Sequence, residues 1–354
     1  MTENNGIRTE QITAQHMFNR CKIEGYDKCA NPYQGCSIGC RYCFASGCFK
    51  NFTGHSQDVW GSYAYPKYYK DRNVSDLSGK RVVIGSVTDP YNQCEAEYHR
   101  TRGILEDLPH DVLPTICTKS DLILSDRFLL SRIPNLTVCV SICSLDADFN
   151  AYMEPGAPSA ERRLATLKSL HEAGVRTCLV ISPIFPHITD VKALLDASQG
   201  SVDEVRFESL CLNDSMIRRR ILDDIRSKYP RYYSNYVRIF VEHDSSYWRG
   251  LEREINELSR QYGVPFEICF NRSMRTQEEP RRIRGIAARQ NEIQPQNADD
   301  ARSRTVRATR NDHEEGRLTR AEWEAICEQE GRYTWNEWWN IYVESAYDNG
   351  YYDD

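Results

Sequence analysis

Short apolar runs alternate with longer helical patterns between about residue 80 and residue 210. The runs are rich in β-branched residues, and this alternation is typical of parallel βαβ units. Helical spacing is plainest over residues 159–173, where Leu164, Leu167 and Leu170 recur on one face before Gly174 ends the segment. We therefore predict helices between strands at residues 81–87, 113–118, 136–142, 175–182 and 204–210.

The same pattern continues with a helix over residues 247–262 and a strand over residues 265–270. One more strand is expected before residue 36. The total is about six or seven parallel strands, fewer than the eight of a closed barrel. The sequence thus predicts an α/β fold: a partial, open parallel β/α barrel with a C-terminal helical extension.

The composition changes after residue 271, which we take as the end of a barrel domain over residues 1–271. From Arg272 to Arg310 there are ten Arg and no Lys against five acidic residues, so we interpret this part as an arm or linker. Residues 311–354 carry twelve acidic residues against three Arg. Two capping-box spacings in them predict an acidic, aromatic helical tail.

The 354-residue chain is 40% hydrophobic and 27% charged, which indicates a folded protein with a sizeable core. No apolar run approaches the ~18 residues of a membrane-spanning helix, and the first residues do not resemble a secretory signal. We therefore expect a cytoplasmic protein without a membrane partner. The net charge of −6 argues against non-specific coating of nucleic acid.

Fourteen cysteines occur in a chain without an export signal, which favours reduced thiols or metal ligands over disulfides. Most of them are solitary within apolar runs, as Cys117, Cys139, Cys178 and Cys269 are. We interpret these as small core residues. Three others are closely spaced.

Cys36, Cys40 and Cys43 form a C-x3-C-x2-C loop. Such a loop can wrap three thiolates around three corners of an iron–sulfur cubane and leave the fourth iron open for a ligand. Gly35 and Gly39 would let the backbone approach the cluster. Structural zinc is the alternative, but it needs a fourth ligand and only Cys48 is near. We therefore predict a 4Fe-4S cluster bound by the three cysteines.

With Tyr42 as its aromatic residue, this loop resembles that of the radical S-adenosylmethionine (SAM) enzymes. The resemblance is to the spore photoproduct lyase-like branch and spans roughly Asn31 to Pro186. It implies that SAM binds the open iron and is cleaved by one electron to a 5′-deoxyadenosyl radical. The similar runs are Asn31-Pro-Tyr-Gln-Gly-Cys36, Gly85-Ser-Val-Thr-Asp-Pro-Tyr91, Thr118-Lys-Ser-Asp121, Met153-Glu-Pro-Gly-Ala-Pro-Ser159 with Arg163-Leu164, and Ser182-Pro-Ile-Phe-Pro-His187.

Several of these residues follow predicted strands, at the edge where α/β folds build their sites. Ser86, Thr88 and Asp89 are expected to hold the amino acid moiety of SAM, unless they only form a turn. Lys119 could meet the SAM carboxylate, as its counterpart does in lyase-like relatives, or face solvent. The resemblance implies that Ser141 bonds the ribose.

Two further groups are interpreted as structural. Glu154 is expected to cap the helix over residues 159–173 or to hold a loop. The three Arg at residues 218–220, with Asp214, Asp223 and Asp224 nearby, predict a solvated, salt-bridged helix face.

Spore photoproduct lyase is understood to return a hydrogen atom from a cysteine, helped by tyrosines. Our placement puts Val87 at the cysteine position, and Phe44 replaces the tyrosine after the third cluster cysteine. Cys94 and Cys143 are the candidate hydrogen donors here. The main hypothesis is therefore a radical SAM enzyme acting on an unidentified substrate.

The alternatives are spore photoproduct repair in DNA and an iron–sulfur protein for electron transfer or sensing. The expected partners are an electron donor such as a flavodoxin or ferredoxin and, through the Arg272–Arg310 arm, a nucleic acid.

Overall fold

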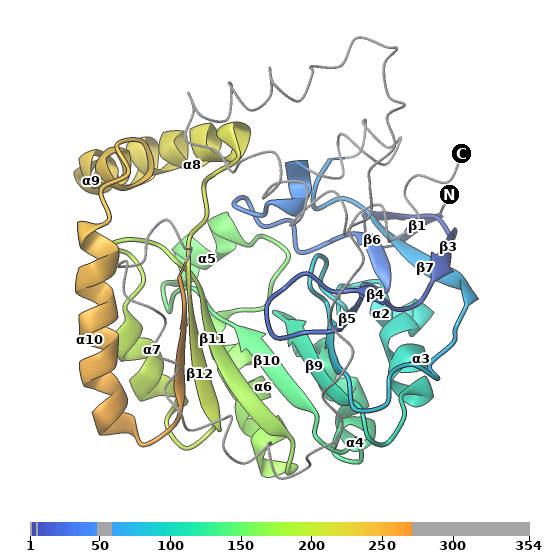
Figure 1. The fold of residues 1–354 in the computed structure, drawn as a ribbon. Coiled ribbons are helices and arrows are strands. Elements are labelled where there is room, and N and C mark those ends of the chain that lie inside the picture. The colour runs from blue at the N-terminus through green and yellow to red at the C-terminus, as the bar shows by residue number, and fades with distance from the viewer. Residues whose placement is uncertain (1, 5, 48–58, 271–354) are drawn as a thin grey trace, which may run out of the picture.

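An eight-stranded sheet forms the centre of the molecule in a computed structural model that describes residues 2–4, 6–47 and 59–270 (Figure 1). In spatial order the strands are β13 (Phe266–Cys269), β12 (Glu204–Ser209), β11 (Arg176–Ile184), β10 (Thr137–Ser141), β9 (Leu113–Thr118), β8 (Arg81–Ile84), β5 (Lys28–Ala30) and β4 (Asn19–Arg20). The strands from β13 to β5 pair in parallel, and β4 is antiparallel to β5. The seven parallel strands confirm the predicted open barrel.

The predicted strands are all present, with small changes at their ends. β8 ends at Ile84, three residues earlier than predicted, because Gly85 turns the chain with φ +88°. A Cβ atom at Gly85 would lie 2.6 Å from the carbonyl oxygen of Cys117 and 2.5 Å from Pro90, so only glycine fits. β11 is longer than predicted, because Ile184 pairs with Ser209 after an irregularity in the ladder.

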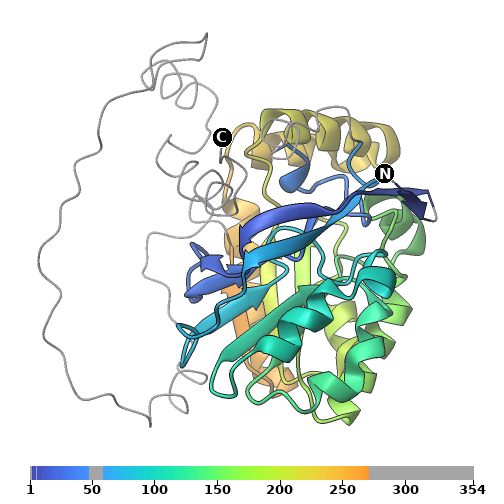
Figure 2. The same cartoon turned by 90° about the vertical axis from the view of Figure 1, so that its right-hand side faces the viewer.

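Helices cover one face of this sheet, as the side view shows (Figure 2). α6 (Ala160–Glu172) agrees with its prediction: Leu167 and Leu170 are fully buried, and Gly174 follows its end with φ +79°. The main core lies between these helices and the sheet. The other elements between strands from β8 to β12 are α2 (Glu95–Tyr98), α3 (Arg100–Asp107), η1 (Asp121–Asp126), α4 (Arg127–Leu130), α5 (Ala147–Met153) and α7 (Val191–Ser198).

The last described helices extend around the sheet. α8 (Ser215–Lys228) and α9 (Tyr233–Phe240), joined by η2 (Pro230–Tyr232), lie above the carboxyl ends of the strands (Figure 1). α10 (Ser246–Tyr262) then runs down the side of the sheet to β13, close to the predicted bounds of 247–262.

The N-terminal part forms two small sheets that the sequence did not predict. β1 (Thr2–Asn4) pairs with β2 (Ile7–Thr9), and β3 (Ile12–His16), β7 (Ala64–Asp71) and β6 (Tyr33–Gly35) form the second sheet in that order. β6 ends immediately before Cys36, so this sheet holds the start of the cysteine loop.

The sheet face opposite these helices carries a row of thiols. Cys117, Cys139 and Cys178 lie on β9, β10 and β11, and the register places each directly beside the next. Cys139 and Cys178 are buried, as predicted for small core residues. Register between distant strands also brings the three thiols together, which their separate positions in the sequence did not indicate. Lys119 and Ser141 follow two residues after Cys117 and Cys139, so alternation puts them on the same face.

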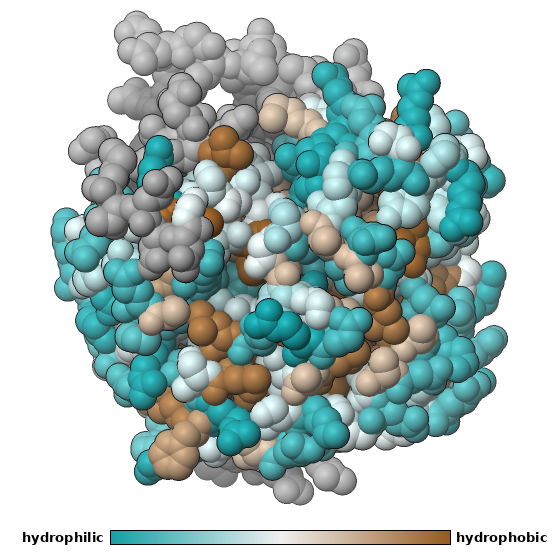
Figure 3. All heavy atoms as spheres, turned by 180° about the vertical axis from the view of Figure 1, so that it is seen from behind, coloured by the Kyte–Doolittle hydropathy of each residue, from teal (hydrophilic) through white to brown (hydrophobic). Residues whose placement is uncertain are grey.

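Seen from behind, the molecule has mainly hydrophilic margins, with apolar side chains singly and in small groups between them (Figure 3). Among the helices in the described ranges, none has the length and apolar character needed to cross a membrane. The predicted arm from Arg272 to Arg310, the predicted tail over residues 311–354 and Cys48 lie outside the described residues.

Candidate functional site at the carboxyl ends of the strands

The cysteine loop gathers its three thiols in one place. Cys36 and Cys40 are buried together with Ile38, and the partly buried Cys43 packs against them. Two glycines allow the loop its shape, and their predicted approach to the cluster stays a prediction. Gly35 has φ +80°, and a Cβ there would lie 2.2 Å from the Tyr63 ring. Gly39 has φ +67°, and its Cβ would lie 2.9 Å from the Cα of Gly61.

Burial raises the pKa of all three thiols, that of Cys36 to about 12. The charge of Lys119 opposes this effect and lowers the pKa of Cys40 and of Cys43, and Arg220 also lowers the pKa of Cys43. Three soft sulfur donors close to two cations suit a group that binds them as thiolates. The donor set therefore fits the predicted 4Fe-4S cluster.

A single metal ion needs several ligands around one position, whereas in a cubane each thiolate binds its own iron. Within residues 2–4, 6–47 and 59–270, no three His, Cys, Asp or Glu side chains surround a position suited to one ion. The assignment of Cys36, Cys40 and Cys43 as cluster ligands stays a prediction.

Helix α8 anchors the cysteine loop through Arg41. The Nε and Nη2 atoms of Arg41 donate to the two carboxylate oxygens of Asp224 at 2.8 and 2.7 Å, and the Tyr152 hydroxyl donates to the same carboxylate at 2.7 Å. Asp224 is only 6% exposed. The predicted solvated face over residues 214–224 is therefore wrong for Asp224, because the helical pattern does not show that α8 lies over the cysteine loop.

The segment after α5 also packs against the same loop. The backbone N–H of Gly156 donates to the carbonyl oxygen of Ile38 at 2.9 Å, and that of Arg41 donates to Met153 at 2.9 Å. A Cβ at Gly156 would lie 2.2 Å from the carbonyl oxygen of Ser37. The two backbones thus meet at a distance that only glycine permits.

Glu154 is the centre of a buried charged network. Its Oε2 lies 2.7 Å from Nη2 of Arg163, its Oε1 lies 3.7 Å from Nζ of Lys119, and the Tyr42 hydroxyl donates to Oε1. Burial by itself raises the pKa of Glu154, but Arg163 and Lys119 outweigh it and hold this pKa below its ordinary value. The carboxylate therefore stays ionised and keeps both cations in place.

Sequence reasoning underrated this glutamate and missed its partner. Glu154 does not cap α6, because the Ser159 side chain accepts the hydrogen bond from the N–H of Arg162. Arg163 is fully buried and also donates to the carbonyl oxygens of Pro158 and Ser141, at 2.8 and 2.9 Å. An arginine inside an otherwise regular helix, one turn after Ser159, was the available signal.

Lys119 and Ser141 are neighbours across two strand ends. The Nζ of Lys119 donates to Oγ of Ser141 at 2.8 Å, and Ser141 in turn donates to the carbonyl oxygen of Ser182 at 2.9 Å. Glu154 and Cys40 offset the effect of burial on Lys119, so the pKa of Lys119 lies above its ordinary value. The ammonium of Lys119 thus lies 5.9 Å from the Tyr42 ring of the cysteine loop, with the Ser141 hydroxyl bonded to it.

The turn after β8 uses most of its polar groups internally. Thr88 donates to the carbonyl oxygen of Tyr33 at 3.0 Å, and Asp89 accepts from the Thr118 hydroxyl and the Lys119 N–H at 2.6 and 2.7 Å. Ser86 accepts from Asn31 at 3.0 Å and is half-buried. Thr88 and Asp89 hold the site together here, and their predicted contact with SAM stays a prediction.

The two candidate hydrogen donors lie in different surroundings. Cys94 packs with Ile7, Tyr33 and Ala64, and burial raises its pKa to about 11. Cys143 is fully buried, and its thiol donates to Asn150 at 3.3 Å. Burial raises the pKa of Cys143, and the charge of Glu154 raises it further, whereas Arg163 and Lys119 lower it. Cys143 is thus the thiol beside the charged network, and Cys94 packs in a separate apolar cluster.

We compared the chain with protein-family models, with known sequences and with solved structures. No protein-family model matches the chain. An uncharacterized protein of Methanocaldococcus jannaschii is 28% identical over 273 residues, 76% of this chain and all of that protein. An uncharacterized protein of Acidianus two-tailed virus is 33% identical over 168 residues, 43% of this chain and 54% of that protein.

Among solved structures, spore photoproduct lyase complexed with dinucleoside spore photoproduct matches with a TM-score of 0.50 and 16% identity. The match covers 72% of this chain and 79% of the lyase. The chain therefore has the fold of spore photoproduct lyase, in agreement with the motifs of its sequence.

Proposed function

We propose that this protein is a radical SAM enzyme that abstracts a hydrogen atom from its substrate. Cys36, Cys40 and Cys43 would hold a 4Fe-4S cluster, and SAM would bind the open iron. With both groups bound, one electron cleaves the sulfonium of SAM to methionine and a 5′-deoxyadenosyl radical. The observation that carries the proposal is the position of Lys119. Its charge lowers the pKa of Cys40 and Cys43, and its ammonium donates a hydrogen bond to Ser141.

The chain's own residues would bind and orient SAM. Lys119 keeps its proton and offers a cation for the SAM carboxylate, and Ser141 offers a hydroxyl for the ribose. Glu154 and Arg163 are positioning residues, because Glu154 pairs with Lys119 and Arg163 holds Glu154. Tyr42 is the aromatic residue of the loop, and its hydroxyl is bound to Glu154. The alternative function, an iron–sulfur protein for electron transfer or sensing, needs no cation and hydroxyl positioned beside the cluster loop.

The electron is expected to come from a low-potential partner such as a flavodoxin or ferredoxin. Arg272–Arg310 provides guanidinium groups for a nucleic-acid substrate, since arginine suits phosphate contacts. Both partners are proposals that rest on the sequence.

Anaerobic reconstitution with iron and sulfide, followed by SAM and dithionite, tests the function directly. We expect methionine and 5′-deoxyadenosine in equal amounts by chromatography. A cluster-loaded chain that binds no SAM and releases no 5′-deoxyadenosine would favour the electron-transfer or sensing alternative.

Repair of spore photoproduct in DNA is the second candidate, favoured by the fold shared with spore photoproduct lyase. UV-irradiated DNA that contains the lesion would be offered to the reconstituted chain, and restored thymines would be measured. Repair that is lost in Cys143→Ala but kept in Cys94→Ala would support this candidate and assign the hydrogen donor. SAM cleavage without repair would leave the general radical function standing and remove this substrate.

A further inference from the structure

The outer face of α8 carries positive charge that is not neutralised within the described structure. Residues 214–231, which cover α8 and η2, contain six basic side chains against three acidic ones: Arg218, Arg219, Arg220, Arg226, Lys228 and Arg231 against Asp214, Asp223 and Asp224. Asp224 is already bound by Arg41. Among the residues that the structure describes, none of these six basic side chains forms a salt bridge. The face is thus positive in a chain whose net charge is −6.

An exposed methionine lies among these charges. Met216 is 64% exposed on the first turn of α8. Arg219, Asp223 and Arg226 follow at spacings of three and four residues and are also exposed, so the four side chains share the outer face of the helix. Methionine adapts to the shape of a partner, and both methionine and arginine are enriched in protein interfaces. An apolar side chain and a carboxylate among the cations suit a protein partner better than a phosphate backbone.

Arg220 connects this face to the cysteine loop. Its Nη2 atom donates to Oγ of Ser46 at 3.4 Å, and Oγ of Ser46 donates to the carbonyl oxygen of Cys43 at 2.8 Å. The charge of Arg220 lowers the pKa of Cys43, which also shows that the two side chains are close. A protein bound to the outer face of α8 would therefore lie about 10 Å, one helix diameter, from the loop. Electron transfer is efficient over such a distance.

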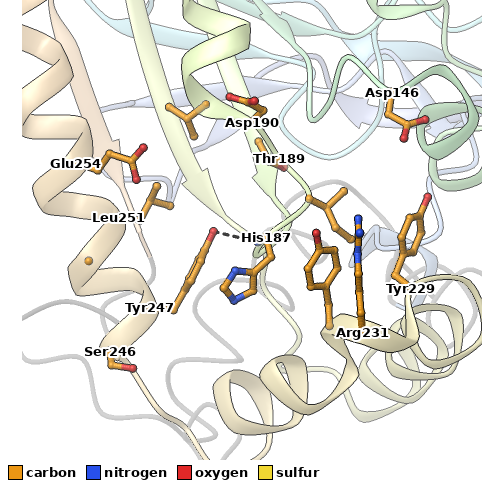
Figure 4. Close-up of a pocket in the computed structure, with 14 residues that line it drawn as sticks. Asp146, His187, Thr189, Asp190, Tyr229, Arg231, Ser246, Tyr247, Leu251 and Glu254 are labelled. Atoms are coloured by element: carbon orange, nitrogen blue, oxygen red, sulfur yellow. Dashed lines mark hydrogen bonds between the residues drawn. The ribbon is translucent and has the colours of Figure 1, made fainter.

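The basic face ends at Arg231. This side chain stacks over the Tyr232 ring at 4.6 Å and lines a cavity beside the carboxyl end of β11 (Figure 4). The other charged side chains that line the cavity are all acidic: Asp146, Asp190 and Glu254. They would repel an acidic partner, so such a partner is confined to α8.

We propose that the outer face of α8, from Met216 to Lys228, docks an acidic electron-carrier protein that reduces the predicted cluster. This inference rests on the proposed function, which needs one electron for each SAM that is cleaved. The reduced carrier would lose one electron and the cluster would gain it. Carboxylates of the carrier are attracted to this face, whereas the chain as a whole is negative, so the charge pattern directs docking to the side of the cysteine loop.

Calorimetric titration of the full-length, cluster-loaded chain with an oxidised, strongly acidic flavodoxin measures docking without turnover. Arg219→Glu combined with Arg226→Glu should lower the flavodoxin affinity about 10-fold or more, because two exposed charges are reversed. Added salt should weaken wild-type binding and reduce this difference. Arg253→Glu combined with Arg260→Glu is the matched control, because both residues are exposed on α10. This control should bind flavodoxin as the wild type does, and thermal unfolding checks that both double variants fold.

SAM cleavage with two reductants separates docking from chemistry. Dithionite is small and needs no docking surface, so the wild type and both double variants should release 5′-deoxyadenosine at the same rate with it. With reduced flavodoxin below its Kd, the α8 variant should be about 10-fold slower than the wild type. Cleavage that fails with dithionite in every protein would refute the proposed function, and the titration would then decide the docking surface by itself.

A short DNA duplex is titrated in the same way, because arginine also binds phosphate. DNA binding that is lost in the α8 variant, with flavodoxin binding kept, would assign the face to nucleic acid and overturn the proposal. Absence of flavodoxin binding by the wild type, or an affinity that the α8 and α10 variants lose equally or not at all, would overturn it as well.

Discussion

The guanidinium of Arg41 and the carboxylate of Asp224 form two parallel hydrogen bonds, of 2.8 and 2.7 Å, between the cysteine loop and α8. They join residues 183 positions apart in the chain. Because Arg41 directly follows Cys40, this pair sets where α8 lies relative to the predicted cluster.

Asp224→Asn should loosen this attachment. The amide cannot accept both hydrogen bonds, so we expect the free energy of unfolding to fall by about 1–3 kcal/mol. The reconstituted variant should also lose its cluster faster in air. Urea unfolding and the decay of visible absorbance measure the two effects. Asp223→Asn is the matched control, since Asp223 is exposed on the same helix, and equal losses in both variants would contradict the role of the pair.

The three cysteines of the loop should each be needed for the cluster. Cys36→Ala, Cys40→Ala and Cys43→Ala combined should remove the iron and sulfide bound on reconstitution, because the thiolates are the ligands. Cys139→Ala is the control, because this cysteine is buried on β10 outside the loop. A triple variant that still binds four irons and four sulfides would refute the ligand assignment.

Lys119 and Ser141 should differ in their importance for SAM. Lys119→Met removes a charged hydrogen-bond donor, so affinity for SAM should fall about 10- to 100-fold, whereas Ser141→Ala should cost about 2- to 10-fold. Equilibrium dialysis with cluster-loaded protein measures both. Lys168→Met, on the exposed side of α6, should bind as the wild type does. Unchanged affinity in Lys119→Met would place the SAM carboxylate elsewhere.

Lys67 should make stability depend on pH in mild alkali. Burial in β7 lowers the pKa of Lys67 from 10.5 to about 8. The unfolded chain therefore binds more protons between these values, and the free energy of unfolding should rise with pH from about 8 to about 10.5, by at most about 3 kcal/mol. Denaturant unfolding at several pH values measures the slope. Lys67→Met should flatten it, and an unchanged slope would assign the pH dependence to other groups.

The parallel strands and the cysteine loop follow from local properties of the sequence. Periodicity located β9 at its observed bounds and the other predicted strands to within a few residues, because apolar alternation and glycine turns are local features. The spacing of Cys36, Cys40 and Cys43 is also local, and that spacing is enough to indicate a cluster. The small N-terminal sheets escaped prediction, because their short strands owe their pairing to distant partners.

The surroundings of that loop depend instead on tertiary contacts. Asp224 looked like a surface charge, and Glu154 like a helix cap or a residue that holds a loop. Both are buried partners of the cysteine loop, because α8 and the end of α5 fold over it. Strand register placed Cys117, Cys139 and Cys178 side by side, and Lys119 beside Ser141. Such contacts join residues far apart in the chain, and they depend on how whole elements pack, which no local pattern of side chains contains.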